Sequence, residues 1–226
     1  MAFGFFAVVV LALCAAIAYF GYAQRQARVR AAAALAQRIG FSFSRADDSG
    51  IRDMPFTLFR RGQGRKAELV LAGTHTNLPL KLFDYEYYVQ GNRSRDYHRF
   101  TCGLLTIPAA CPPLRISREN VLTRIGDHLT HHDVKLEYDD FNNRFNINCE
   151  DQKFAFALLD GQMMEWLLAA DGADPLARFD HIEIVGLWVL IAHLRIPPAS
   201  WLNLGTWLDN FHSHIPPIVY STFPNR

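Results

Sequence analysis

The sequence predicts an α+β protein with an N-terminal transmembrane helix, followed by one domain with a mostly antiparallel sheet, a mid-chain helical pair and a C-terminal helix. Three observations support this prediction. The chain opens with an uncharged apolar stretch, its middle holds strand-type segments separated by short polar turns, and apolar residues at helical spacing return near its end. The predicted segments are a transmembrane anchor over 1–23, a helical basic stem over 24–39, a soluble α+β domain over 40–215 and an irregular tail over 216–226.

The N-terminal stretch is long enough to cross a bilayer as a helix. Residues 2–23 contain no charged side chain, and about 20 such residues cover the roughly 30 Å hydrocarbon core. A cleaved signal peptide would need a basic segment before a shorter apolar core, although the Ala-Ile-Ala triplet at 16–18 imitates a cleavage site. A lipoprotein signal would need a small residue before Cys14, where Leu13 stands. The sequence therefore favours a permanent signal-anchor.

Basic residues follow the apolar stretch but do not precede it. We take Arg25, Arg28 and Arg30 as membrane-flanking basic residues. Because Lys and Arg near one end of a span keep that end in the cytoplasm, we expect a single-pass protein of the cell membrane with its C-terminal domain in the cytoplasm. Residues 24–66 hold ten basic and three acidic groups. This excess favours contact with anionic lipid, but ordinary positive-inside bias explains it equally well.

Composition limits the classes of function. The formal net charge of +1 lacks the strong basic excess of a nucleic-acid-binding protein, so we expect no nucleic-acid partner. A hydrophobic content of 50% is typical of a chain that folds. Cys14 lies in the anchor, and the three remaining cysteines, Cys102, Cys111 and Cys149, form no C-x-x-C pair. An odd number of thiols in the soluble part suits a reduced cytosolic domain.

The first half of the soluble part is predicted to form strands, after Gly40 ends the stem helix. We expect these strands over 41–44, 56–60, 67–73, 80–89 and 97–107. The last two are separated by a Gly-Asn-Arg-Ser turn, which indicates a hairpin. Alternation places Phe83, Tyr85 and Tyr87 on one face of their strand, where core packing is favoured over a ligand platform. The Ala-Ala-Cys-Pro-Pro run at 109–113 is expected to break the sheet.

The second half mixes helices with extended segments. We expect a short helix over 120–129 and two extended runs within 134–149. Asp151 is a good N-cap for two short helices that Asp160 and Gly161 divide. The apolar run at 182–194 is interrupted by Gly186, which predicts two strands joined by a tight bend. Ser200 is expected to cap the last helix, whose apolar stripe contains Trp201, Leu204, Leu208, Phe211 and Ile215.

Two segments, 83–102 and 137–168, resemble a family of uncharacterised bacterial, largely actinobacterial, single-pass membrane-anchored proteins. The resemblance rests on an F-N-x-x-F…D-x-x-x-A…L-L-x-x-x-M-M-E-W-L-L pattern. It falls here on Phe141, Asn142, Phe145, Asp151, Ala155, Leu158, Leu159, Met163, Met164, Glu165, Trp166, Leu167 and Leu168. The resemblance covers roughly residues 55–195. It implies a membrane-anchored layout and brings no established activity.

The densest group of possible metal ligands is a histidine cluster at 128–133. On a helix, His128 and His132 would stand at i and i+4 and could hold a divalent metal together with Asp133. The segment lacks the Glu of an H-E-x-x-H motif and fits a passage from loop to strand, so a surface loop is favoured. The glycines at 62 and 64 lack the spacing of a phosphate-binding loop. We therefore predict no catalytic residue, no cofactor and no resident metal.

Two functions remain open at this point. The first is a non-catalytic cytoplasmic interaction domain, whose partners are the membrane lipid bilayer and a protein at the inner membrane surface. The alternative is a membrane-tethered, metal-dependent hydrolase that uses the histidine cluster at 128–133.

Overall fold

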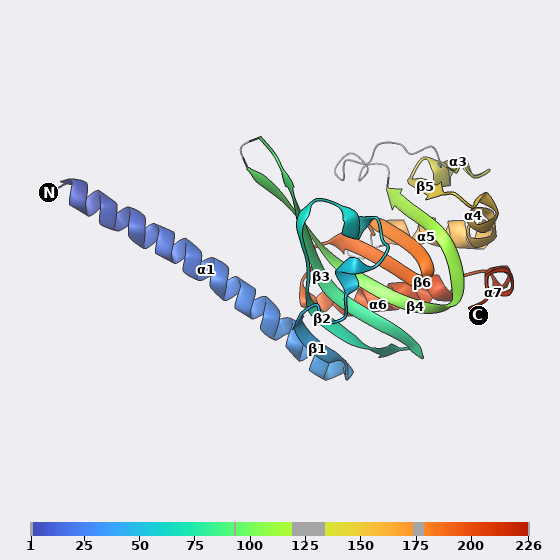
Figure 1. Ribbon diagram of the computed structural model, residues 1–226, viewed down its shortest axis with the longest axis horizontal. Coiled ribbons are helices and arrows are strands. Elements are labelled where there is room, and N and C mark those ends of the chain that lie inside the picture. The colour runs from blue at the N-terminus through green and yellow to red at the C-terminus, as the bar shows by residue number, and fades with distance from the viewer. Residues whose placement is uncertain (1, 93, 119–133, 174–178, 226) are drawn as a thin grey trace.

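A six-stranded antiparallel sheet forms the centre of the domain, and several helices cover one of its faces (Figure 1). The computed structural model describes residues 2–92, 94–118, 134–173 and 179–225, with side chains from Val10 onward except at 172 and 173. The strands are β1 Ser42–Ala46, β2 Gln63–His75, β3 Leu78–Gln90, β4 Arg95–Arg118, β5 Phe145–Cys149 and β6 His181–Leu194. The helices are α1 Ala2–Ile39, α3 Asp139–Asn142, α4 Gln152–Leu158, α5 Gly161–Ala173, α6 Trp201–Ser213 and α7 Pro217–Thr222, with 3₁₀ turns η1 Ile51–Asp53, η2 Leu58–Arg60 and η3 Pro198–Ser200. The α+β class and the antiparallel sheet are confirmed.

β4 organises the sheet because it pairs on both edges. Strands β1, β2 and β3 follow one another in a meander, β3 pairs with the first part of β4, and β5 pairs with its last part. β6 runs along the opposite edge of β4, from the pair Phe100↔Leu194 to the pair Ser117↔His181. The predicted hairpin of two long strands is confirmed as β3 and β4.

The predicted break of the sheet at 109–113 is wrong, because β4 is one strand of 24 residues that runs through this segment. The prolines there cannot donate to the ladder, and the register with β6 shifts on both sides of Cys111. Cys111 stands opposite Gly186, whose φ of 58° only glycine adopts readily. β6 is therefore one bent strand, and the two strands expected over 182–194 are the halves of it.

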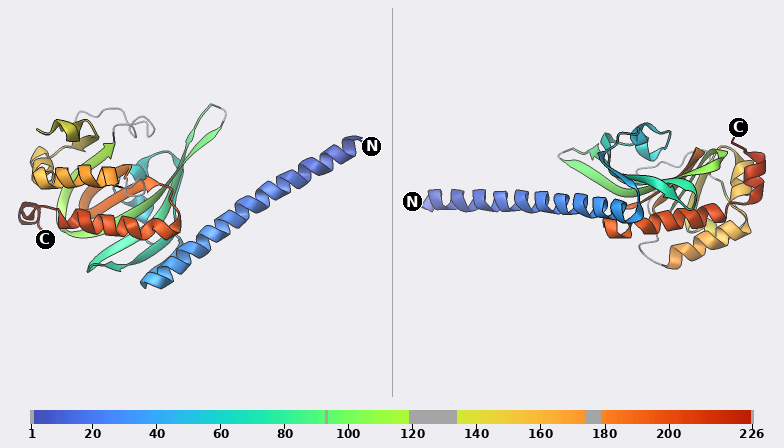
Figure 2. Two further views of the ribbon diagram at one scale, coloured as in Figure 1. Left: turned by 180° about the vertical axis from the view of Figure 1, so that it is seen from behind. Right: turned by 90° about the horizontal axis from the view of Figure 1, so that it is seen from below.

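The two faces of the sheet carry separate cores. Phe83, Tyr85 and Tyr87 share one face, as predicted, and are at most 1% exposed. Phe56 and Phe59, from the segment between β1 and β2, cover them, with ring centroids of Phe59 and Tyr85 4.7 Å apart. The larger core lies on the opposite face, where α4, α5, α6 and α7 pack (Figure 2).

A buried carboxylate fastens the covering segment to the sheet. Glu183 on β6 is 2% exposed and accepts hydrogen bonds from Thr57 N at 2.6 Å, Thr57 Oγ1 at 2.7 Å and Leu58 N at 2.9 Å. It also pairs with His181 Nε2. The strand predicted over 56–60 is therefore wrong, and this segment contains η2 instead. Glu183 stabilises η2 because its carboxylate caps the first amides of the turn. Burial raises the pKa of Glu183, but His181 and the Thr57 hydrogen bonds outweigh it and lower that pKa to about 2.

The C-terminal third confirms the predicted helical pair. Asp151 Oδ1 accepts from Phe154 N at 3.0 Å, which confirms the N-cap, and α4 and α5 are divided at Asp160. Ser200 precedes α6 but forms no capping hydrogen bond through its side chain. Part of the segment predicted as an irregular tail forms α7. Of the two extended runs predicted within 134–149, the second forms β5, and α3 lies before it. The helix predicted over 120–129 lies outside the described residues.

Candidate functional site

α1 has two halves that differ in their surroundings. Ala32, Leu35 and Ala36 are at most 3% exposed and pack against the domain. Toward the N-terminus the helix leaves the domain and projects away from it (Figure 1). Its 38 residues span about 57 Å at 1.5 Å per residue. One continuous helix therefore joins a docked segment to a free one, with no loop between them.

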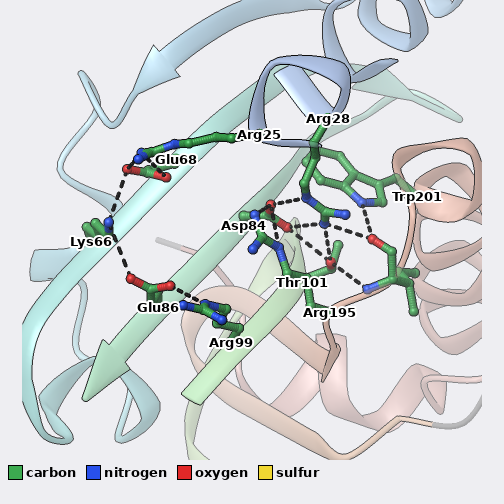
Figure 3. Close-up of polar contacts among 11 residues, drawn as sticks. Arg25, Arg28, Lys66, Glu68, Asp84, Glu86, Arg99, Thr101, Arg195 and Trp201 are labelled. Carbon is green, nitrogen blue, oxygen red and sulfur yellow. Dashed lines mark hydrogen bonds and ion pairs between the residues drawn. The ribbon is translucent and has the colours of Figure 1, made fainter. Parts of the chain in front are cut away.

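The docked half is held by Arg28, which enters a polar junction between α1, the sheet and η3 (Figure 3). Its guanidinium donates to Asp84 through Nε to Oδ2 at 2.6 Å and through Nη2 to Oδ1 at 2.7 Å. Nη2 also donates to the carbonyl oxygen of Ile196 at 2.7 Å, and the group lies 5.6 Å from the ring centroid of Trp201. A bidentate pair of this kind fixes orientation as well as distance.

Asp84 is the centre of this junction. Besides Arg28 it accepts from Thr101 Oγ1 at 3.1 Å and from Arg195 Nη2 at 3.1 Å. Thr101 Oγ1 in turn accepts from Ile196 N at 3.2 Å. The Asp84 side chain is 7% exposed and that of Arg28 17% exposed, so both charges are largely removed from water. Such a pair stabilises only while both partners are present.

Strand alternation explains how the aspartate reaches α1. On β3, Leu80, Leu82, Asp84 and Glu86 point to the same face, because successive side chains alternate. The first two join the larger core, and the acidic pair continues the row beyond its edge. The sequence LKLFDYEYYV thus contains a signal for the junction, namely two acids within a run that is otherwise rich in apolar and aromatic residues.

A row of exposed charges extends the junction across the sheet. Arg25 Nη2 pairs with Glu68 at 3.0 Å, Lys66 bridges Glu68 and Glu86 at 3.4 and 3.3 Å, and Arg99 Nε donates to Glu86 at 2.5 Å. Burial raises the pKa of Glu86, but the hydrogen bond from Arg99 and the charge of Lys66 produce a net lowering. Partly exposed pairs of this kind contribute at most about 1 kcal/mol each, so the pair of Arg28 and Asp84 is the strongest polar contact of α1 with the sheet.

The predicted flanking arginines have different surroundings. Arg25 pairs with Glu68, Arg28 lies in the junction, and Arg30 is exposed. The sequence does not reveal Asp84 or Trp201 as partners of Arg28, because those residues lie 56 positions or more away from it.

No metal-binding group of three His, Cys, Asp or Glu occurs among the residues that the structure describes. The candidates His128, His132 and Asp133 lie outside those residues.

The resemblance motif packs the core at seven of its positions, which are at most 2% exposed: Phe141, Phe145, Ala155, Leu158, Leu159, Met163 and Leu167. Ion pairs and hydrogen bonds make up the polar junction, and these contacts fix α1 against the sheet.

Over the described residues, no helix is both long enough and apolar enough to cross a membrane, so the predicted transmembrane helix is not supported by the structure.

Comparison with known proteins gives one likeness of fold. No protein-family model matches the chain, and no curated protein sequence does. The crystal structure of the mycobacterial trehalose monomycolate transport factor A, TtfA, is similar with a TM-score of 0.58 at 13% sequence identity. The match covers 84% of this chain and 97% of that chain. At this identity the likeness is one of fold, and the chain shares the α+β architecture of that bacterial transport factor.

Proposed function

We propose that this protein is a non-enzymatic, membrane-associated protein that holds an interaction domain against a bilayer. In this proposal the apolar N-terminal part of α1 is a single-pass anchor, and the α+β domain presents its surface to lipid or protein partners at the inner membrane face. The observation that carries the proposal is the continuity of α1, which runs from an exposed apolar segment into the buried junction at Arg28 without a break.

The exposed segment supports a lipid environment. Leu11, Leu13 and Ile17 are between 61% and 69% exposed, and Phe20 is 63% exposed, although each is a large apolar side chain. Burying one such side chain contributes about 1.5–3 kcal/mol. Residues 2–23 contain no charge that would oppose insertion. A bilayer accounts for both the uncharged sequence and the absence of a protein cover over the described part of this segment.

The direction of insertion follows from the unfolded chain. Arg25 and Arg28 are paired within the folded domain, but the positive-inside bias acts during insertion, before those pairs form. They therefore still favour a cytoplasmic domain. The β3–β4 hairpin projects to the same side of the domain as the N-terminal half of α1 (Figure 2), so this end of the sheet would face the membrane.

The structural neighbour is consistent with this role. It is described as a trehalose monomycolate transport factor, which is not an enzyme name. The motif resemblance to bacterial, largely actinobacterial membrane-anchored proteins supports the same proposal. We extend to this chain only the general role, in which a membrane-associated protein assists lipid or protein partners.

Vesicle flotation of the full chain tests the proposal. We expect wild-type protein to float with phosphatidylcholine vesicles. The Leu13→Asp/Ile17→Asp double variant should remain at the bottom, because each aspartate adds about 2.5–3.5 kcal/mol to the cost of insertion at the centre of a span. The matched control is Phe156→Asp/Ile218→Asp, which places the same charges on domain residues that are 51% and 57% exposed. Equal flotation of the two double variants would contradict a role for α1 in membrane binding.

A further inference from the structure

A second feature, separate from the junction, lies between η1, η2 and the start of β2. There the surface forms an open cavity of about 510 Å³. Three arginines line it together with one acidic and two apolar residues: Arg52, Arg60, Arg65, Asp53, Met54 and Phe59.

The cavity carries an excess of positive charge. Arg65 Nη1 donates to the Phe59 carbonyl oxygen at 3.0 Å, which holds that guanidinium at the rim and leaves its other donors available. Arg52 lies 3.8 Å from Asp53, and both side chains are more than half exposed, so this pair is weak. Within the described residues, Arg60 has no carboxylate partner. Guanidinium groups gathered in this way bind phosphate oxygens through charge-assisted hydrogen bonds.

The cavity also has an apolar component. Its accessible apolar surface comes from Met54, which packs against the aromatic core on this face and remains partly accessible, whereas Phe59 lies behind it and is only 1% exposed. A wall of this composition suits a ligand that joins an anionic group to an apolar one. It suits a fully hydrated inorganic ion less well, because such an ion gains nothing from the apolar side.

The cavity lies beside the base of the β3–β4 hairpin. Gln63 pairs with Tyr88, and a Cβ placed on Gly64 would lie 2.4 Å from Tyr88 Cε1, so the tyrosine ring covers the Gly64 backbone directly. The guanidinium of Arg95, at the start of β4, lies over the Tyr88 ring, with its Cζ 4.6 Å from the ring centroid. Any side chain at position 64, which lines the cavity, would displace the Tyr88 ring.

The position of the hairpin relates the cavity to α1. Four residues of β3 separate Asp84, which contacts Arg28, from Tyr88, a distance of about 13 Å. The β3–β4 hairpin projects to the same side of the domain as the N-terminal half of α1 (Figure 2), so under the proposed function the cavity lies on the side of the domain that faces the membrane.

We propose that this cavity binds the phosphate group of an amphiphilic ligand, with Arg52, Arg60 and Arg65 as its phosphate contacts. Two sources share this chemistry: an anionic phospholipid of the membrane in which α1 is inserted, and a soluble phosphate ester. The first source rests on the proposed function, whereas the second does not require a bilayer.

Arginine footprinting of the full chain in nanodiscs tests the site. Phenylglyoxal modifies accessible arginines, and mass spectrometry reads the rate at each position. In one arm, phosphatidylcholine discs are compared with discs that also contain phosphatidylglycerol. In the other arm, phosphatidylcholine discs receive glycerol 3-phosphate or sodium chloride at equal ionic strength. We expect modification of Arg52 and Arg60 to slow by about sixfold at a ligand concentration about five times Kd, with Arg38 and Arg45, both exposed, as internal references.

Each outcome is decisive. Protection only in phosphatidylglycerol discs identifies a lipid ligand, and protection only by glycerol 3-phosphate identifies a soluble one. The absence of protection in both arms, or equal protection of Arg38 and Arg45, would overturn the proposal. If flotation fails but glycerol 3-phosphate protects the cavity, the proposed function fails and the site stands.

A double variant separates the cavity from the overall charge. Arg52→Gln/Arg60→Gln should abolish the ligand-dependent protection of Arg65, which remains as the reporter. Arg38→Gln/Arg45→Gln removes the same charge from exposed positions outside the cavity and should leave that protection unchanged. Circular dichroism of both variants confirms that each is folded. Loss of Arg65 protection in both variants would show an effect of net charge alone and would contradict the site.

Discussion

Replacing Asp84 with alanine should lower the free energy of unfolding by about 3–5 kcal/mol. The substitution leaves the guanidinium of Arg28 largely buried, with its bidentate partner removed, and takes one partner from Arg195. Thr101 Oγ1 also loses its acceptor. Urea unfolding of the full chain in detergent micelles, followed by tryptophan fluorescence, measures the loss, because Trp201 packs beside Arg28.

Glu86 supplies a matched control on the same strand and the same face. Its partners Lys66 and Arg99 are 42% and 49% exposed, so Glu86→Ala should cost less than about 1 kcal/mol. Similar losses for the two variants would mean that the junction is no more than a surface ion pair. In that case Asp84 would not be the residue that docks α1.

Replacing Glu183 with glutamine should lower the free energy of unfolding by about 3 kcal/mol at pH 7, and this difference should disappear in acid. A pKa lowered from 4.5 to about 2 corresponds to about 3 kcal/mol of stability from the ionised form. Because the folded pKa lies below the unfolded one, the unfolded chain binds more protons between these values. The stabilisation is therefore complete above pH 4.5 and is lost as the pH falls toward 2.

Urea unfolding of wild type and Glu183→Gln across this range measures the effect. The two unfolding curves should converge as the pH decreases from 4.5. Glu165→Gln, at an exposed position of α5, removes the same charge and should show no difference at any pH. A gap between wild type and Glu183→Gln that persists unchanged at pH 2.5 would contradict the role assigned to the carboxylate.

The alternation of β3 and the capping residue of α4 could be predicted from the sequence because they depend on near neighbours. Phe83, Tyr85 and Tyr87 share a face by the period of a strand, and Asp151 caps through an amide three residues away. The continuity of β4 and β6 could not be predicted in this way. Judged from their near neighbours, Pro112 and Gly186 predict turns. They lie at an irregularity within the sheet because two long strands pair on both sides of them.

The polar junction at the candidate site could not be predicted from the sequence either, because its partners are distant along the chain. From the sequence, Arg28 is expected at the membrane flank, because basic residues that follow an apolar helix typically lie at the cytoplasmic end of a span. Its bidentate partner Asp84 comes from a strand 56 residues away, and the carbonyl of Ile196 from 168 residues away. The sequence gives only indirect evidence of such long-range partners, here an acidic residue, Asp84, within a strand that is rich in aromatic residues. The arginines of the cavity were counted in the basic excess, but their meeting at one surface depends on η1 and η2.

The reactivity of the native Cys14 thiol tests the central claim that a bilayer covers the free half of α1. Cys14 is exposed in the structure, as is Ala34 on the docked half of the same helix. Burial raises the pKa of Cys111 to about 12 and that of Cys149 to about 11, and Cys102 is fully buried, so these thiols do not compete. In intact vesicles that contain the full chain with its domain outward, a membrane-impermeant maleimide should modify Ala34→Cys quickly and leave Cys14 unmodified. Equal rates at the two positions would contradict the account.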